Sequence, residues 1–302
     1  MAVRKLTELF DLVKEKEIKT MVVVCANDEH TIAAVSEAVV QNLVKGVLIG
    51  DETKIGSVCH ECGIDYSRFT IINQPVEELA ASLAVEMINR GEGDILMKGL
   101  ISTDKFLRAI LNKENGLTDL GKVVSHVTIV ENENYHKLLI VSDVAVIPLP
   151  DLNQKVQIIR YLVEVANRLE IDHPKIAVIA PSEQVLPSIL STTEAALLAK
   201  MNERGQIKGC IVDGPLALDV AIDSEAAAIK GLKSPVAGDA DCLLFPNLES
   251  GNVFYKVNTK LARSESAAIM VGVRVPVVLA SRGDSVRVKL LSIALGALMA
   301  ND

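Results

Sequence analysis

The stretch VPVVLASRGDSVRVKLLSIALGALMA, Val275 to Ala300, contains the unit from which this fold is assembled. Its beginning is an apolar run, which predicts a buried strand, and its end is amphipathic, which predicts a helix. The apolar face of that helix carries Val288, Leu291, Leu295 and Leu298. Residues 281–285, which have no apolar side chain, separate the strand from the helix. A strand that turns directly into a helix is typical of α/β proteins.

Apolar runs of this kind alternate with amphipathic stretches along the chain. The strand candidates are residues 21–26, 46–50, 69–73, 94–99, 123–130, 138–142, 175–180, 209–214, 242–246 and 275–280. Asp151 and Gln154 form a capping-box pattern at the start of one predicted helix. Ser191 and Glu194 repeat that pattern at another helix, which is expected to end at Gly205. The alternation predicts an α/β protein with largely parallel sheets.

The composition excludes several classes of protein. The chain has 302 residues, enough for two domains, and a formal net charge of −8, so we expect no nucleic-acid partner. Five cysteines, an odd number at low density, favour a reducing cytoplasm. No apolar run approaches the ~18 residues of a membrane span, and the N-terminus does not resemble a signal peptide. Cys59 and Cys62 form one CxxC pair without the further ligands that zinc needs, so no metal site is predicted.

The junction at residues 281–285 has the composition of an anion site. The start of a helix leaves N–H groups without intrahelical partners and carries partial positive charge. Arg282 and the hydroxyls of Ser281 and Ser285 add donors that suit phosphate. Asp284 would repel phosphate, so it either caps the helix or accepts a proton. The alternative is an ordinary polar turn in which Asp284 or Ser285 is the N-cap.

Other junctions offer further candidates. In ILMKGLISTDKFLRAIL, the side chains of Lys98, Ser102, Thr103 and Arg108 could converge on an anion; the alternative is a capped helix with solvated cations. His30 follows the first predicted strand, at the edge where ligands gather in open α/β folds. Asn252 and Lys256 lie on a predicted helix that a Gly-Asn turn opens, and Asp213 and Asp219 follow another strand. Each of these four side chains, from Asn252 to Asp219 in the sentence above, could have a structural role instead of binding a ligand.

Taken together, these stretches resemble the phosphate acetyl/butyryltransferase family. The matching pieces occur in family order: CANDEHTIAAV, GLISTDKFLRAIL, SDVAVIPLPD, VDGPLALDVAI, SPVAGDADCLLFPNLESGNVFYK and SRGDSV. The segment from Asp213 to Lys256 is the most specific of them. The compact length and the ending SRGDSVRVK resemble the butyryl branch more than the acetyl branch.

The resemblance implies a two-domain fold of the isocitrate/isopropylmalate dehydrogenase type with largely parallel sheets. One discontinuous domain would hold residues 1–120 and 267–302, and the other would hold residues 121–266, with the active site in the cleft between them. Both anion-binding junctions would then belong to one domain, where Arg108 and Arg282 are expected to meet. The resemblance also implies a homo-oligomer, with a homodimer as the minimum.

The implied reaction is reversible transfer of butyryl from coenzyme A (CoA) to phosphate, with both as substrates and no cofactor. The implied catalytic residues are Ser281, Arg282 and Asp284. The implied phosphate and CoA ligands are Lys98, Ser102, Thr103, Arg108, His30, Asn252 and Lys256. A guanidinium group can hold phosphate through two hydrogen bonds, and a donor aimed at the thioester carbonyl stabilises the oxyanion. Arg282 is the first candidate for that donor and Ser281 the second.

The sequence departs from the family pattern at three positions. The acetyl branch has an aspartate base seven residues after the serine of the Ser-Arg pair, where this chain has Val288. Either Asp284 substitutes for it or no dedicated base exists, since a thiol is already a few per cent ionised at pH 7. His30 stands where arginine is common, and Val144 where the acetyl branch has cysteine. The alternatives are a phosphate acetyltransferase, a metal- and NAD-dependent dehydrogenase on the same fold, and a non-catalytic anion-binding protein.

Overall fold

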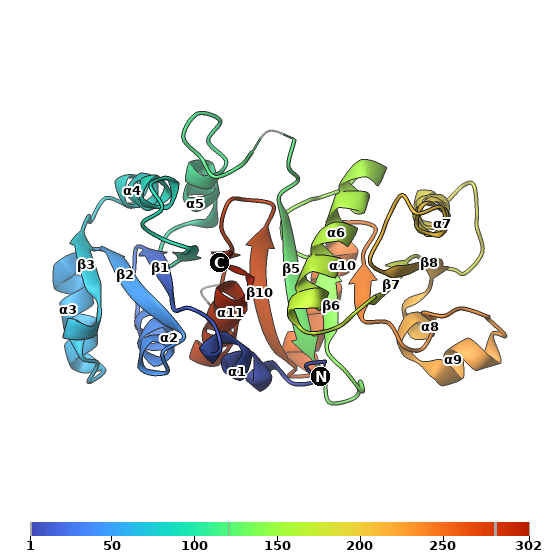
Figure 1. Cartoon of the computed structure of the whole chain (residues 1–302), viewed down its shortest axis with the longest axis horizontal. Coiled ribbons are helices and arrows are strands. Elements are labelled where there is room, and N and C mark those ends of the chain that lie inside the picture. The colour runs from blue at the N-terminus through green and yellow to red at the C-terminus, as the bar shows by residue number, and fades with distance from the viewer. Residues whose placement is uncertain (1, 120, 281–282, 302) are drawn as a thin grey trace. The chain divides into compact units, whose positions relative to one another are not determined.

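The computed structural model describes residues 2–119, 121–280 and 283–301. Contacts between residues group the chain into two compact units (Figure 1). Unit 1 holds Met1–Leu6 and Ser125–Ser266, and unit 2 holds Thr7–Val124 and Ala267–Asp302. Each is described by itself below. The domain bounds and the cleft expected from the family resemblance stay predictions.

The sheet of unit 2 is parallel except at one edge. Its strands are β1 (Lys19–Val24), β2 (Val44–Gly50), β3 (Thr70–Asn73), β4 (Ile95–Lys98), β10 (Glu265–Val271) and β11 (Val277–Val278). They lie in the order β3-β2-β1-β4-β11-β10, and β10 is antiparallel to β11. In β1, Met21 to Val24 are fully buried, as expected of a central strand that is covered on both faces.

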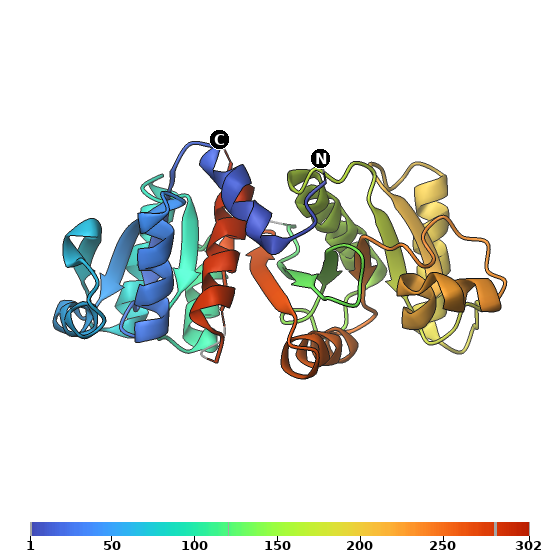
Figure 2. The same cartoon turned by 90° about the horizontal axis from the view of Figure 1, so that it is seen from below.

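Helices cover both faces of this sheet. They are α1 (Leu9–Lys14), α2 (Glu29–Val40), α3 (Glu52–Glu61), α4 (Glu77–Asn89), α5 (Thr103–Ile110) and α11 (Val286–Met299), with short 3₁₀ turns η1 (Leu6–Glu8) and η2 (Tyr66–Arg68). α4 packs with α5 on one face, whereas α11 packs with α1 and α2 on the other (Figure 2). The prediction of a single apolar face for α11 is wrong, because every residue from Lys289 to Met299 is buried between its neighbours.

The strands of unit 1 lie in the order β5-β6-β9-β7-β8. Its strands are β5 (Ser125–Glu131), β6 (Leu139–Ser142), β7 (Lys175–Ile179), β8 (Ile211–Leu216) and β9 (Cys242–Leu244). Its helices are α6 (Leu152–Arg168), α7 (Leu190–Glu203), α8 (Leu218–Ile222), α9 (Ser224–Ile229), α10 (Leu248–Lys256) and the π-helical turn η3 (Val257–Leu261). Only the β5–β6 pair is antiparallel among the strand pairs described within this unit. The predicted α/β class and largely parallel sheets are therefore confirmed.

The predicted helix boundaries are confirmed in part. Asp151 and Gln154 form the expected capping box at the start of α6, and Gly205 adopts a φ of 73° just after α7. Ser191, however, does not cap α7, which begins one residue earlier without a side-chain cap. Glu194 forms an ion pair with Lys155 of α6 instead. None of the helices in the described part of the chain is long and apolar enough to cross a membrane.

Candidate active site

Three helices begin at the carboxyl edge of the unit 2 sheet. Because β1, β4 and β11 are parallel, the segments that follow them leave the sheet at the same edge. α2, α5 and α11 start there, capped by the side chains of Asp28, Ser102 and Ser285. Helix starts concentrate N–H donors and partial positive charge, which favour an anionic ligand, while Asp28, Glu29 and Asp104 add negative charge at the same helix starts.

The turn after β4 uses its polar groups internally. Lys98 is 4% exposed, and its ammonium donates hydrogen bonds to the carbonyls of Gly99 (3.1 Å) and Ile101 (2.9 Å). The Ser102 hydroxyl accepts a hydrogen bond of 3.3 Å from the N–H of Lys105, while Thr103 is exposed on the first turn of α5. Ser102 thus has the capping role that the alternative interpretation gave it, and Lys98 holds the turn rather than extending into solvent.

Arg108 lies on the exposed face of α5. Its guanidinium pairs with Asp104 one turn earlier at 2.9 Å, and both side chains are 78% exposed. The neighbouring Lys105 pairs with Glu77 and Glu78 of α4, and hydrogen bonds to these two carboxylates raise the pKa of its ammonium. Exposed pairs of this kind hold side chains weakly, so Arg108 can exchange Asp104 for another anion at small cost.

The junction after β11 is described only in part. Ser281 and Arg282 lie outside the described residues, so the predicted meeting of Arg108 and Arg282 stays a prediction. Ser285, not Asp284, caps α11, and its hydroxyl accepts a hydrogen bond of 3.3 Å from the N–H of Val288. Asp284 is half-buried. Of the two residues that the sequence offered as the N-cap of this helix, Asp284 and Ser285, the structure shows Ser285 in that role.

His30 lies at the same edge, as its position after the first strand predicted. It is exposed on the first turn of α2. The adjoining turn is tightly packed, because the Asn27 side chain accepts a hydrogen bond of 3.0 Å from the N–H of Asp51, and a Cβ on Gly50 would lie 2.4 Å from that same oxygen. A side chain at position 50 would therefore have to displace the Asn27 amide from the hydrogen bond that joins the turns after β1 and β2.

Asn252 and Lys256 belong to unit 1. The Asn252 amide donates a hydrogen bond of 2.9 Å to the carbonyl of Val144, and a Cβ on Gly251 would lie 2.2 Å from the carbonyl of Asp143. The Gly-Asn pair therefore holds α10 against the turn that follows β6. Lys256 is exposed, with its ammonium 5.8 Å from the centroid of the Tyr255 ring. This contact supports the structural role that the sequence analysis gave as the alternative for Asn252.

Sequence reasoning missed the buried carboxylate next to that turn. Asp143 is 2% exposed and accepts hydrogen bonds from four donors. The donors are the Ser125 hydroxyl (2.8 Å) and the N–H groups of His126 (3.1 Å), Ala145 (2.7 Å) and Val146 (2.8 Å). A buried charge of this kind is stable only when its hydrogen bonds are complete. The signal in the sequence was an acidic residue directly after an apolar strand, in SDVAVIPLPD.

The other acidic candidates serve the structure of unit 1. Asp213 accepts a hydrogen bond from the N–H of Gly214. Asp219 pairs with Lys230 at 3.0 Å, and the hydrogen bond from Lys230 lowers the pKa of its carboxyl. Within residues 2–119, 121–280 and 283–301, no group of three or more His, Cys, Asp or Glu side chains is arranged to hold a metal ion.

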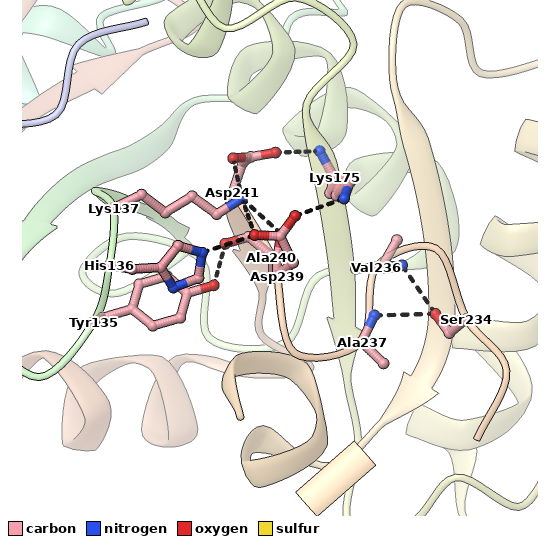
Figure 3. A network of polar contacts seen from close by, with 10 residues as sticks. All are labelled: Tyr135, His136, Lys137, Lys175, Ser234, Val236, Ala237, Asp239, Ala240 and Asp241. Atoms are coloured by element: carbon pink, nitrogen blue, oxygen red, sulfur yellow. Dashed lines mark hydrogen bonds and ion pairs between the residues drawn. The ribbon is translucent and has the colours of Figure 1, made fainter. Parts of the chain in front are cut away.

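The segment SPVAGDAD, residues 234–241, is fixed by charge (Figure 3). Asp239 pairs with His136 (2.8 Å), Lys137 (2.9 Å) and Lys175 (2.6 Å), and Lys137 also pairs with Asp241 (2.7 Å). Partial burial works to raise the pKa of Asp239, but hydrogen bonds from Lys175, Lys137 and His136 outweigh it and hold that pKa well below its usual range. The segment is thereby tied to the β5–β6 connection and to the start of β7.

Known proteins resemble this chain over nearly its whole length. Residues 73–297 match the family described as phosphate acetyl/butaryl transferase. The chain is 45% identical to a phosphate butyryltransferase of Clostridium acetobutylicum, covering 99% of both chains. It is 44% identical to a phosphate acetyltransferase of Thermotoga maritima, covering 93% of this chain and 95% of that one. The crystal structure of a branched-chain phosphotransacylase from Enterococcus faecalis V583 matches with a TM-score of 0.81 at 28% identity, covering 93% of this chain and 98% of that chain.

Proposed function

This chain belongs to the phosphate acetyl/butaryl transferase family, and from that premise we propose that it transfers a butyryl group reversibly between CoA and inorganic phosphate. The observation that carries the proposal is the near-complete match to a phosphate butyryltransferase, 45% identical over 99% of the chain. The described carboxyl edge of unit 2, with three helix N-termini, supports it by offering the donors that phosphate needs.

The reaction exchanges one bond to the acyl carbon for another. A phosphate oxygen attacks the thioester carbonyl, an oxyanion forms, and the carbon–sulfur bond breaks with its electron pair leaving on the CoA thiolate. In the proposal, Arg282 and Arg108 hold phosphate, while Arg282 and Ser281 stabilise the oxyanion. Thr103 adds a donor at the start of α5. In the reverse direction the CoA thiol must lose its proton, either to a base or to water.

Fewer observations bear on the acyl-chain preference than on the reaction itself. The chain is similar to butyryl- and acetyl-transferring relatives at 45% and 44% identity, and a solved relative is described as branched-chain. One methylene in an apolar pocket changes specificity by only ~1–3 kcal/mol. We favour butyryl because the ending SRGDSVRVK resembles that branch, and we keep phosphate acetyltransferase activity as the alternative.

The remaining expectations form part of the same proposal. CoA and phosphate act as substrates, and no resident cofactor is involved. The protein acts in the cytoplasm as a homo-oligomer, at least a dimer, in butanoate metabolism. The dehydrogenase-like detail of the fold, and with it a metal- and NAD-dependent dehydrogenase, is the more distant alternative.

A thiol-release assay tests the function. Free CoA thiol is followed after addition of butyryl-CoA, with and without phosphate, and phosphate-dependent release is expected. Release without phosphate would indicate a thioesterase, and no release would favour a binding protein. Repeating the assay with acetyl-CoA compares the two acyl chains and decides between the branches.

Arg282→Ala tests the proposed chemistry at one residue. Loss of an oxyanion donor lowers turnover by about 10²–10³-fold, so we expect at least about a hundredfold loss. Arg68→Ala is the matched control, because Arg68 is an exposed arginine paired with Asp65 on η2. Near-normal turnover of the Arg282 variant would remove this arginine from the mechanism.

A further inference from the structure

A buried lysine holds the turn that joins strand β4 to helix α5. Lys98 is the last residue of β4 and is 4% exposed. Its ammonium donates hydrogen bonds to the carbonyls of Gly99 (3.1 Å) and Ile101 (2.9 Å). Hydrogen bonds from a charged donor are stronger than those between neutral groups. The lysine side chain therefore folds back over the turn that follows it and holds two of its carbonyls.

The first half of the same turn is fixed by the backbone after β1. The N–H groups of Gly99 and Leu100 donate hydrogen bonds of 2.8 Å to the carbonyls of Val24 and Cys25. A Cβ on Gly99 would lie 2.5 Å from the Cys25 carbonyl oxygen, too close for any side chain without a shift of the backbone. The turn thus has two anchors, the backbone after β1 at its beginning and the Lys98 ammonium at its end.

The carbonyl of Ile101 decides where the next N–H group points. The peptide between Ile101 and Ser102 is trans, so its C=O and N–H point in opposite directions. Because the ammonium of Lys98 holds the carbonyl, the N–H of Ser102 points away from the lysine. In the described part of the chain, no group accepts a hydrogen bond from the N–H of Ser102, Thr103 or Asp104. These three consecutive donors are available to a ligand at the start of α5.

The carboxylates near these donors are paired with cations. Asp104 pairs with Arg108 at 2.9 Å on the exposed face of α5. Glu77 and Glu78 of α4 pair with Lys105 at 2.8 Å and 2.7 Å. Their negative charges are thereby partly offset, which lowers the repulsion that an anion would meet at the start of α5.

We propose that Lys98 is a positioning residue for phosphate binding: by holding the carbonyls of Gly99 and Ile101, it directs the first N–H groups of α5 toward phosphate. The inference rests on the proposed function, in which Thr103 is a phosphate donor at this helix start. Lys98 acts through the backbone and makes no contact with phosphate itself. A shift of about 1 Å in such donors is enough to weaken binding severely.

Kinetics of Lys98→Met test the inference. Methionine fills most of the space of the lysine stem but cannot hold the two carbonyls. We expect KM for phosphate to rise about tenfold or more, while KM for butyryl-CoA changes less than about threefold. Phosphate-dependent thiol release measures both constants, with each substrate varied at a saturating concentration of the other.

Lys155→Met is the matched control. Lys155 is buried to a similar degree, at 3% exposure, but it pairs with Glu194 between α6 and α7 in unit 1. We expect Lys155→Met to lower the thermal unfolding temperature without changing either KM. If Lys98→Met behaves like this control, losing stability with both KM values unchanged, Lys98 has a structural role only and the inference is overturned.

Gly99→Ala displaces the same turn by another route and leaves the lysine in place. We expect it to raise KM for phosphate severalfold alone, and less than about twofold further in the Lys98→Met background. Gly56→Ala on α3 is its control, because a Cβ there meets only the Tyr66 ring, at 3.9 Å, and KM should not change. Effects of the two substitutions that multiply would mean that Lys98 acts independently of the turn, as a direct phosphate ligand would, and would overturn the inference.

Failure of the proposed function is recognised separately. It would show in the unsubstituted protein as an absence of phosphate-dependent thiol release. In that case the positioning role is judged from inorganic phosphate alone, which should raise the thermal unfolding temperature of the native protein and of Lys155→Met more than that of Lys98→Met. An equal rise in all three proteins, or no rise in any, would overturn the inference. The comparison of the two lysine variants decides the question even if Gly99→Ala does not fold.

Discussion

The carboxyl edges of the sheets in the two units differ in how their buried charges are compensated. In unit 1 the carboxylate of Asp143 is 2% exposed and accepts hydrogen bonds from four donors of its own unit, and the buried ammonium of Lys155 at the start of α6 is paired with Glu194. In unit 2 the charges are the ammonium groups of Lys98 and Lys289, at 4% and 3% exposure. Asp143 immediately follows strand β6, and Lys98 is the last residue of β4. Lys289 lies instead on α11, the helix that follows β11.

The difference indicates which edge is suited to an anion. A carboxylate with a complete set of donors adds negative charge and holds its turn closed. Ammonium groups next to helix N-termini add positive charge where N–H donors already gather. Electrostatics thus favour phosphate at the edge of unit 2, which is also the unit that contains residues 281–285.

The largest effect is expected from Asp143→Ala. The substitution leaves buried donors without an acceptor, each costing about 1–3 kcal/mol, so the free energy of unfolding should fall by about 3–5 kcal/mol. Urea denaturation measures it. Asp219→Ala is the control, because Asp219 is 55% exposed and its pair should contribute no more than about 1 kcal/mol. A loss below about 1 kcal/mol for Asp143→Ala would show that the two edges do not differ as described.

A smaller loss of stability is expected from Lys98→Met. The methionine fills most of the space of the lysine stem, but the carbonyls of Gly99 and Ile101 lose their donor. Because removal of a buried charge offsets part of that loss, we expect the free energy of unfolding to fall by about 1–3 kcal/mol. Unfolding in urea, with Lys113→Met as an exposed lysine control on the segment after α5, checks this value. A fall in the free energy of unfolding as large as that expected for Asp143→Ala would show that the two edges do not differ in this respect.

The dependence of stability on pH tests the ion pairs that Asp239 forms with His136, Lys137 and Lys175 in unit 1. The pKa of Asp239 is depressed in the folded protein, so its contribution is present above the unfolded pKa of about 3.9 and is lost as pH falls through the lower folded value. Asp239→Asn should therefore flatten the fall in stability below about pH 4. Unfolding midpoints measured from pH 6 downwards check this. If stability falls below about pH 4 in Asp239→Asn just as it does in the unsubstituted protein, then Lys137, Lys175 and His136 do not stabilise the carboxylate.

The smallest effect concerns thiol reactivity. Burial raises the pKa of Cys25 and of Cys210 to about 11, whereas Cys62 is exposed at the end of α3. Since the thiolate is the reactive form, a thiol reagent at pH 8 should label Cys62 first and the buried thiols only after unfolding. Peptide mapping of the labelled protein identifies the site. Rapid labelling of Cys25 would show that the end of β1 opens at the edge of unit 2.

Much of the fold was predictable because it depends on patterns with a short period. Each predicted strand run overlaps or adjoins an observed strand, and the capping box of Asp151 and Gln154 is confirmed. The strand β10 was missed, because ESAAIMV begins with polar and small residues and its strong strand formers are confined to Ile269–Val271. The interpretation of Ser191 as a cap was wrong because α7 already begins at Leu190, which places Ser191 inside the first turn of the helix.

The places of the described candidate residues in the fold were predictable, but their contacts were not. The sequence placed His30, Lys98 and residues 281–285 at the ends of strands, which follows from strand–helix alternation alone. It could not show that the Lys98 ammonium is used by its own turn, because hydrogen bonds to backbone carbonyls leave no signature in residue type. It likewise gave no sign that Asn252 holds the Val144 carbonyl rather than a ligand.

The sequence by itself determined the α/β class, the parallel sheets and the family, because hydrophobic periodicity and ordered motifs are properties of the chain. Only the tertiary structure decided which charges are buried and with which partners. Lys289 follows Arg287 in an amphipathic-looking run and reads as a solvated residue until α1 and α2 cover it. The burial of Lys289 depends on how α11 packs against other helices, which no local pattern contains.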